Sequence, residues 1–153
     1  MGYLLSYLAL GAIFFLIGST IVVTVYVMRS FGLYNMAKNR NAPNPWMAWI
    51  PIVSNYLSGS MVNQIVIQEY TIQNLALLNM VIPFIGLALA NARFVGRLIM
   101  LASNLFATLV HYHLFKQYRS DSGVCLIYAI FPFMGFFKLR NEKPDLATSE
   151  SII

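Results

Sequence analysis

The sequence has few charged residues, few acidic residues and a single cysteine. Charged side chains make up 10% of the 153 residues, and Asp and Glu together number five. Because an average soluble domain is about 25% charged, a soluble globular domain is a poor description of this chain. Cys125 is the only cysteine, so no disulfide can form within the chain.

The scarcity of acidic residues also restricts the chemistry that the chain could perform. All five lie in segments that we expect to be loops or the C-terminal tail: Glu69, Asp121, Glu142, Asp145 and Glu150. The apolar segments therefore lack the paired carboxylates of acid–base catalysis. The sequence also lacks a glycine-rich phosphate loop and a nucleophile motif. We predict a protein without enzymatic activity and without a cofactor.

Apolar residues are what the chain has in abundance. They account for 59% of it, against about 45–50% in soluble domains, and the mean hydropathy is +0.68. Long apolar runs predict helices that span a lipid bilayer. We predict an all-α integral membrane protein with a single domain over residues 1–140. Its fold is a bundle of four or five transmembrane helices, some of them broken at proline or re-entrant.

The N-terminal apolar run is the clearest span, because residues 3–28 contain no charged side chain. Arg29, Lys38 and Arg40 follow it, which predicts that the N-terminus lies outside the cell and that the loop 29–45 is cytoplasmic. The formal net charge is +5. Since the basic residues form no run, we read this charge as a topology signal in a cell (inner) membrane and not as a nucleic-acid-binding patch.

Four further apolar segments follow the first span. Their expected boundaries are 46–68, 72–90, 94–115 and 124–137. Pro51, Pro83 and Pro132 each lie among apolar residues in these segments, and proline breaks or kinks helices. Residues 141–153 are polar, and we expect a disordered tail there.

The segment 46–68 has two interpretations, because Ser, Asn and Gln dilute its apolar character. It is either a polar-faced span, which we slightly favour, or a re-entrant or interfacial helix. The distribution of basic residues does not decide between them. With five spans, eight of the ten basic residues lie inside and Lys116 and Arg119 lie outside. If 46–68 and 124–137 only dip into the bilayer, eight basic residues again lie inside and two lie outside. The two outside are then Arg93 and Arg97.

One predicted helix carries a polar stripe along an otherwise apolar surface. At about 100° per residue, five polar side chains fall within roughly 60° of one another: Arg93, Arg97, Asn104, Thr108 and His111. Such groups are costly to expose to lipid, so we expect polar partners on other helices or a water-filled gap. The candidate partners are Asn55, Asn63, Gln64, Asn74 and Asn79.

Simpler readings of these residues are also open. Arg93 and Arg97 could extend to lipid phosphates and fix the topology. His111 and His113 are two apart on the predicted helix, so their side chains point about 200° from each other and cannot share a metal ion. We therefore predict no metal site.

The residues around two tryptophans carry a resemblance to a known family. Trp46 and Trp49 sit one turn apart, as membrane-interface anchors do, within the stretch Trp46-Met47-Ala48-Trp49-Ile50-Pro51 that leads to Asn55-Tyr56. With Ile82-Pro83 and Phe131-Pro132-Phe133, this stretch resembles a family of small bacterial multi-pass membrane proteins of unknown function. The resemblance implies a bacterial inner membrane and carries over no functional residue.

Three functions fit these observations. The first is a non-enzymatic accessory or self-associating subunit, whose partner is a membrane protein or a second copy of the chain. The second is a small transporter or channel with a polar path from Arg93 to His111. The third is a self-protection (immunity-type) protein against a membrane-active peptide, which the small size and positive charge allow.

Overall fold

The computed structural model describes residues 2–62, 65–67, 70–89, 92 and 94–144. Its α-helices are α1 (Gly2–Asn39), α2 (Val53–Val62), α3 (Leu75–Ala88), α4 (Val95–Lys116), α5 (Ser122–Ile130) and α6 (Pro132–Leu139). A 3₁₀-helix, η1, covers Pro45–Trp49, and the strands β1 (Ile65–Ile67) and β2 (Tyr70–Ile72) form an antiparallel hairpin. The predicted predominance of helix is confirmed, but the short hairpin was not anticipated.

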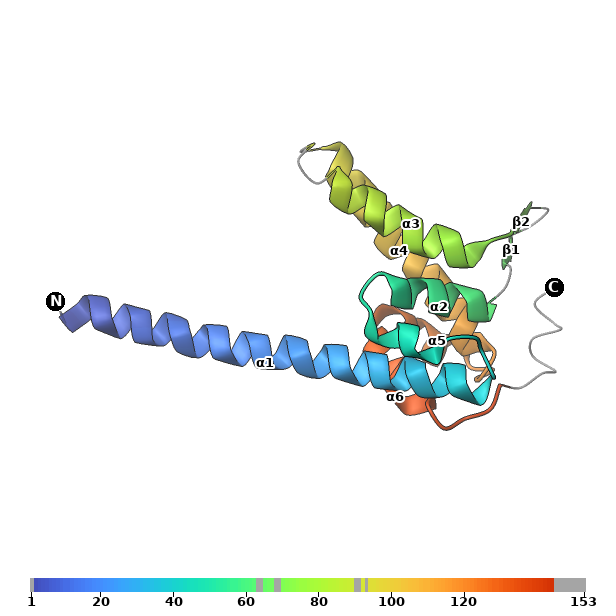
Figure 1. The fold of residues 1–153 in the computed structure, drawn as a ribbon, viewed down its shortest axis with the longest axis horizontal. Coiled ribbons are helices and arrows are strands. Elements are labelled where there is room, and N and C mark those ends of the chain that lie inside the picture. The colour runs from blue at the N-terminus through green and yellow to red at the C-terminus, as the bar shows by residue number, and fades with distance from the viewer. Residues whose placement is uncertain (1, 63–64, 68–69, 90–91, 93, 145–153) are drawn as a thin grey trace.

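Helix α1 is much longer than the predicted span. Its 38 residues give a length of about 57 Å at 1.5 Å per residue. The N-terminal half projects from the molecule, and the C-terminal part joins the compact region formed by the other elements (Figure 1). The prediction that residues 29–45 form a loop is therefore wrong up to Asn39. Tertiary packing extends the helix, since Leu33, Met36 and Ala37 form a fully buried face.

The buried part of α1 packs very closely against α6. A Cβ atom added to Gly32 would lie 2.4 Å from the backbone carbonyl carbon of Phe136, so only glycine allows this approach. Phe136 is fully buried, as are Phe115 and Leu114 of α4. The core of the protein therefore begins between the C-terminal part of α1 and α6 and continues over α4 and α2.

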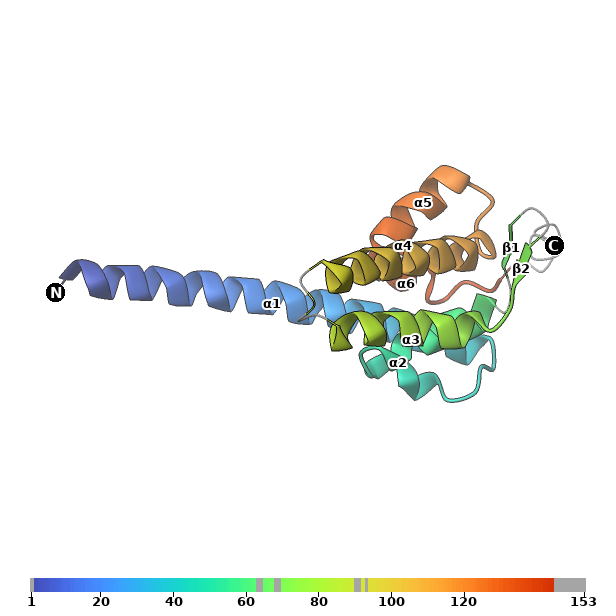
Figure 2. The same ribbon diagram turned by 90° about the horizontal axis from the view of Figure 1, so that it is seen from above.

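Helices α3 and α4 form an antiparallel pair that lies side by side in both ribbon views (Figures 1 and 2). Helix α4 matches the predicted span 94–115 to within one residue at each end. Helix α3 is shorter than the predicted span 72–90, because β2 ends at Ile72 and the helix begins at Leu75. Pro83 lies inside α3 without ending it.

The segment 46–68 does not form one helix. It is divided into η1, a turn through Pro51 and Ile52, the ten residues of α2 and strand β1. A helix of ten residues is about 15 Å long, which is half of the roughly 30 Å hydrocarbon layer. The interpretation of this segment as a continuous span is therefore wrong, and the non-spanning interpretation fits the structure.

The last apolar segment, 124–137, is also broken, as Pro132 predicts. Helices α5 and α6 meet at an angle of 119°. Five apolar side chains around this bend are exposed: Leu126, Ile127, Ile130, Phe131 and Met134. At the start of the tail, Glu142 pairs with Arg119 at 2.9 Å. The predicted disorder therefore does not apply to residues 141–144, and residues 145–153 lie outside the described part of the chain.

Two described helices, α1 and α4, are long and apolar enough to span a membrane, and the bent α5–α6 pair would make a third. Helix α3 is apolar but shorter, with 14 residues. The predicted helical fold is confirmed, and two or three of its helices have the length and apolar character of a span.

Arg40, just after α1, joins the ends of three elements. Its guanidinium donates to the Tyr118 hydroxyl at 2.8 Å, to the Met61 carbonyl at 2.7 Å and to the Gln117 side chain at 2.5 Å. It also lies 4.8 Å from the centre of the Tyr118 ring. Burial raises the pKa of the Tyr118 hydroxyl, although Arg40 opposes this shift, so the hydroxyl stays neutral and can accept.

We expect Arg40→Met to lower the free energy of unfolding by about 3 kcal/mol, because it removes three charge-assisted hydrogen bonds and leaves their part-buried acceptors unpaired. The matched control is Arg119→Met, whose exposed ion pair with Glu142 should contribute less than about 1 kcal/mol. Denaturant unfolding of both variants in detergent, followed by circular dichroism, measures the difference. Equal losses in the two variants would contradict the role of Arg40.

Candidate functional site

The predicted polar stripe of α4 does not form one continuous cluster in the structure. Arg97 is exposed, and Arg93 lies outside the described residues. The Asn104 amide donates to the Met100 carbonyl at 2.9 Å, and the Thr108 hydroxyl donates to the Asn104 carbonyl at 2.8 Å. Both polar groups thus bond to their own helix, and these hydrogen bonds do not reach the partners predicted on other helices.

His111 lies in the aromatic core and not beside the other polar groups of the stripe. Its side chain is 4% exposed, and its ring centre lies 5.3 Å from that of Phe136 and 6.2 Å from that of Phe115. The Nε2 atom is buried without a hydrogen-bond partner. The surroundings of His111 are therefore those of a core residue. Among the described residues, no group of three or more His, Cys, Asp or Glu side chains could hold a metal ion.

The structure instead brings together a polar cluster between α1, α2 and α3, which we call the Arg29 cluster. The guanidinium of Arg29 donates to the Ser54 hydroxyl at 2.8 Å and to the Asn55 side-chain oxygen at 2.9 Å. It also lies 5.8 Å from the centre of the Phe136 ring. The cation is thus held by two neutral acceptors at the first turn of α2 and by an aromatic face.

Asn79 connects this cluster to α3. Its side-chain amide donates to the Asn55 carbonyl at 2.8 Å and to the Ser58 hydroxyl at 3.1 Å, and Asn79 and Ser58 are almost completely buried. Asn55 and Asn79 had been candidate partners for the stripe on α4. The structure pairs them with each other and, through Asn55, with Arg29.

The charge of Arg29 is not balanced by a carboxylate within the described part of the chain. The ion pair found there joins Arg119 to Glu142, while Asp121 accepts hydrogen bonds from the first turn of α5. Arg29 also lies beside the N-terminus of α2, which is the positive end of a helix dipole. The Arg29 cluster is therefore a place of uncompensated positive charge.

The turn that presents Ser54 and Asn55 to Arg29 has an unusual backbone. Ile52 has a φ of 69°, a left-handed conformation that is rare for a β-branched residue. On the side of α1, the Tyr26 hydroxyl donates to the Trp49 carbonyl and holds the segment before this turn. Backbone strain of this kind persists where surrounding contacts determine the conformation, and it occurs often at functional sites.

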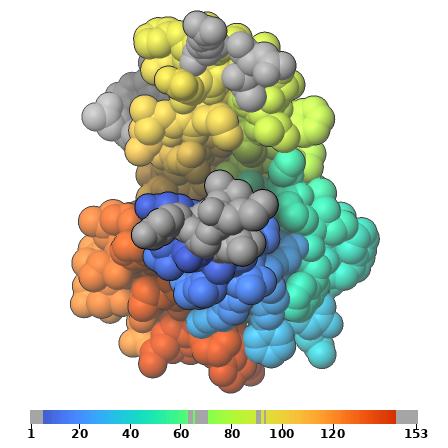
Figure 3. Space-filling model, turned by 90° about the vertical axis from the view of Figure 1, so that its left-hand side faces the viewer, coloured from blue at the N-terminus to red at the C-terminus, as the bar shows by residue number. Residues whose placement is uncertain are grey.

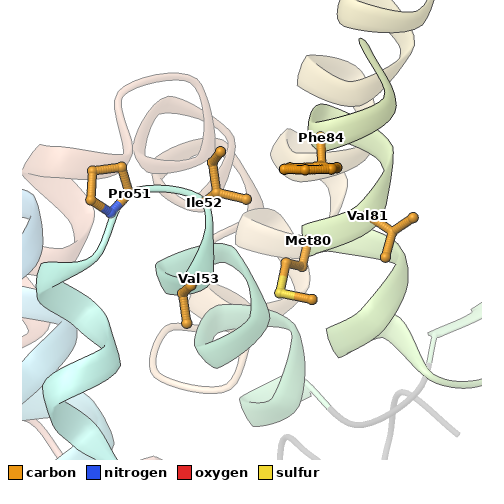
Figure 4. Close-up of a pocket in the computed structure, with 6 residues that line it drawn as sticks. All are labelled: Pro51, Ile52, Val53, Met80, Val81 and Phe84. Carbon is orange, nitrogen blue, oxygen red and sulfur yellow. The ribbon is translucent and has the colours of Figure 1, made fainter. Parts of the chain in front are cut away.

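An apolar pocket lies on the other side of the same turn. It has a volume of about 380 Å³ and is lined by Pro51, Ile52, Val53, Met80, Val81 and Phe84. Met80 and Phe84 point from α3 toward Ile52 and Val53 (Figure 4). Since Val53 directly precedes Ser54, the pocket and the Arg29 cluster share one turn of the chain.

The two tryptophans lie near this turn, in η1. Trp46 and Trp49 are both largely exposed, as residues that anchor a protein at the membrane interface would be.

In the sequence, Arg29 gives only a topology signal, and its contacts with α2 are not predicted. The available signal was the position of Arg29 directly after an uninterrupted apolar run, because an ionisable group at such a boundary needs partners. Ser54 and Ser58 are two of the serines that dilute the apolar character of the segment 46–68, and this dilution alone does not predict a contact with Arg29.

No family model matches the chain, and no curated protein or solved structure is similar to it.

We expect His111→Phe to leave the free energy of unfolding unchanged or to raise it by about 1 kcal/mol, since it replaces an unpaired buried nitrogen with carbon. Asn79→Leu is the contrasting variant, because it removes the two buried hydrogen bonds that the Asn79 amide donates to the Asn55 carbonyl and the Ser58 hydroxyl, and it should cost about 1–3 kcal/mol. Thermal unfolding in detergent compares the two. A loss in His111→Phe as large as that in Asn79→Leu would show that His111 has a polar partner.

Proposed function

We propose that the protein is a non-enzymatic, self-associating subunit embedded in a cell membrane. The observation that carries this proposal is the N-terminal half of α1. Residues 6–18 are all exposed, and they include the large apolar side chains of Phe14, Phe15 and Leu16. An apolar surface of this size has to be covered by lipid or by another helix.

Two glycines on this part of α1 favour contact with another helix. Gly11 and Gly18 are seven residues apart and share one face of the helix. Apart from the backbone of α1 itself and the neighbouring residues in the chain, no atom lies within 4 Å of a Cβ atom added at either position, so this face is open. Small residues allow two transmembrane helices to approach closely, and such contacts drive association in lipid.

We infer three crossings of the membrane, by α1, α3 and α4, from the apolar character of these helices. The N-terminal half of α1 extends far beyond the other helices, whereas the joined ends of α3 and α4 lie beside the middle of α1, on the side of the compact region from which α1 projects (Figure 2). In this arrangement, the antiparallel α3 and α4 enter the bilayer together and return to the same side, which requires the pair to lie farther toward the N-terminus of α1 than it does in Figure 2. Helix α4 has 22 residues, or about 33 Å. The shorter α3 would require local thinning of the bilayer.

The basic residues agree with this topology. Arg93 precedes α4 in the sequence and Arg97 lies in its first turn, and the other eight of the ten basic residues lie on the side of the compact region. The positive-inside rule then places the compact region in the cytoplasm and the N-terminus outside. The exposed apolar side chains of η1 and of the α5–α6 bend support contact of the compact region with the inner leaflet.

Transport has less support than association. Asn104 and Thr108 bond to their own helix, and His111 is enclosed by aromatic rings, so these residues offer no chain of polar contacts along α4. The resemblance to small bacterial membrane proteins supports a bacterial inner membrane as the location.

Cysteine labelling in intact cells distinguishes three crossings from five. In a Cys125→Ala background, we expect Ala92→Cys to react with a membrane-impermeant reagent applied from outside, because the turn between α3 and α4 would be external. We expect Thr71→Cys, in β2, to react only after permeabilisation. The five-span arrangement reverses both results, so external labelling of Thr71→Cys would overturn the proposed topology.

Substitution of the open face of α1 tests self-association. We expect Gly11→Leu and Gly18→Leu each to reduce the dimer fraction of the full-length protein in lipid several-fold, because a larger side chain separates the helices. The matched control is Ala9→Leu, which adds similar bulk, one carbon atom less, to the opposite face. Fluorescence energy transfer between labelled copies measures the dimer fraction, and an unchanged value in both glycine variants would contradict the proposal.

A further inference from the structure

The Arg29 cluster and the adjacent pocket have complementary properties. The cluster offers a guanidinium bound to two neutral acceptors, 2.8 and 2.9 Å away. A guanidinium has five N–H donors, and these two bonds leave others for a further acceptor. The pocket is lined by six side chains, all of them apolar. One end of a suitable ligand would therefore be anionic, and the other would be a hydrocarbon.

The positive end of α2 strengthens the case for an anion. A cation beside a helix N-terminus is unfavourable in itself, because the helix dipole places partial positive charge there. A bound anion would interact favourably with both the guanidinium and the helix end. Phosphate suits this position, since arginine presents paired donors to phosphate oxygens.

The position of the pocket points to a lipid tail as the apolar part. Helix α2 begins at the end of the compact region from which α1 projects (Figure 1). Seen from that end, α1 emerges between the segment of η1 and α2, the pair α5–α6, and the joined ends of α3 and α4 (Figure 3). Under the proposed topology, this end faces the bilayer. Phe84, at the edge of the pocket, is 60% exposed, so the pocket is open to a chain that enters from the lipid.

We propose that this turn forms a binding site for an anionic phospholipid of the inner leaflet. Its phosphate pairs with Arg29 beside the first turn of α2, and one acyl chain occupies the pocket between Ile52 and Phe84. The left-handed conformation of Ile52 places Ser54 toward Arg29 on one side and Ile52 itself into the pocket on the other. This inference rests on the proposed location in the membrane.

Native mass spectrometry of the full-length protein in detergent tests the site directly. The probes are phosphatidylglycerol, phosphatidylcholine and inorganic phosphate, each titrated separately. We expect phosphatidylglycerol to bind at least five-fold more tightly than phosphatidylcholine, and inorganic phosphate to bind weakly, because it lacks the chain that fills the pocket.

Two variants address the two halves of the ligand. Arg29→Gln keeps a donor for Ser54 or Asn55 but removes the charge, and Val81→Trp fills the pocket from α3. Each should weaken phosphatidylglycerol binding at least five-fold. The matched controls are Arg97→Gln, an exposed arginine in the first turn of α4, and Leu87→Trp, an exposed position on α3 outside the pocket. Neither control should change binding by more than two-fold.

The outcomes separate this site from its alternatives. If inorganic phosphate binds as tightly as the lipid and Val81→Trp has no effect, the ligand is a soluble anion, and the lipid proposal is overturned. If Val81→Trp and Leu87→Trp bind phosphatidylglycerol equally well, the pocket is not the site, and this result stands even if Arg29→Gln does not fold. Because binding is measured in detergent, it is independent of the labelling and dimerisation experiments that test topology and self-association.

Discussion

Arg29 and Arg40 lie on or just after α1, eleven positions apart, and between them they hold the compact region to this helix. Arg29 bonds to the start of α2, and Arg40 bonds to its end at Met61 and to the end of α4 at Gln117 and Tyr118. Each cation is matched by neutral acceptors and an aromatic ring. Because the chain has very few acidic residues, its part-buried cations need carbonyl, hydroxyl and amide oxygens instead.

This arrangement also explains why α1 is continuous. A span that ended at residue 28 would leave Arg29 and Arg40 in a loop, without fixed positions relative to α2 and α4. Helix α1 is one rigid helix with two different halves. Its N-terminal half is apolar and exposed, and its C-terminal half has one fully buried face, formed by Leu33, Met36 and Ala37. The proposed anchoring and self-association belong to the first half, and the proposed lipid site lies at the junction of the two, where the apolar surface ends and the first cation begins.

The prolines show how far local sequence decides structure. Pro51, Pro83 and Pro132 lie in similar apolar surroundings, yet the chain breaks at Pro51 and Pro132 and continues through Pro83. Proline removes one backbone donor and disfavours the helix before it. Whether a helix continues depends on the packing around it, and α3 is supported by α2 on one side and α4 on the other.

The sequence by itself determined that the chain is mainly helical, that α4 has the length of a span, and that the last apolar segment is interrupted. These properties follow from composition and from periodic patterns of nearby residues. Only the tertiary structure decided the length of α1, the division of the segment 46–68 and the members of the polar cluster. Arg29 meets Ser54 and Asn55 across 25 and 26 positions of the chain. Helical periodicity relates residues within a few turns, so it placed Asn104, Thr108 and His111 on one stripe but could not show which distant groups each would meet.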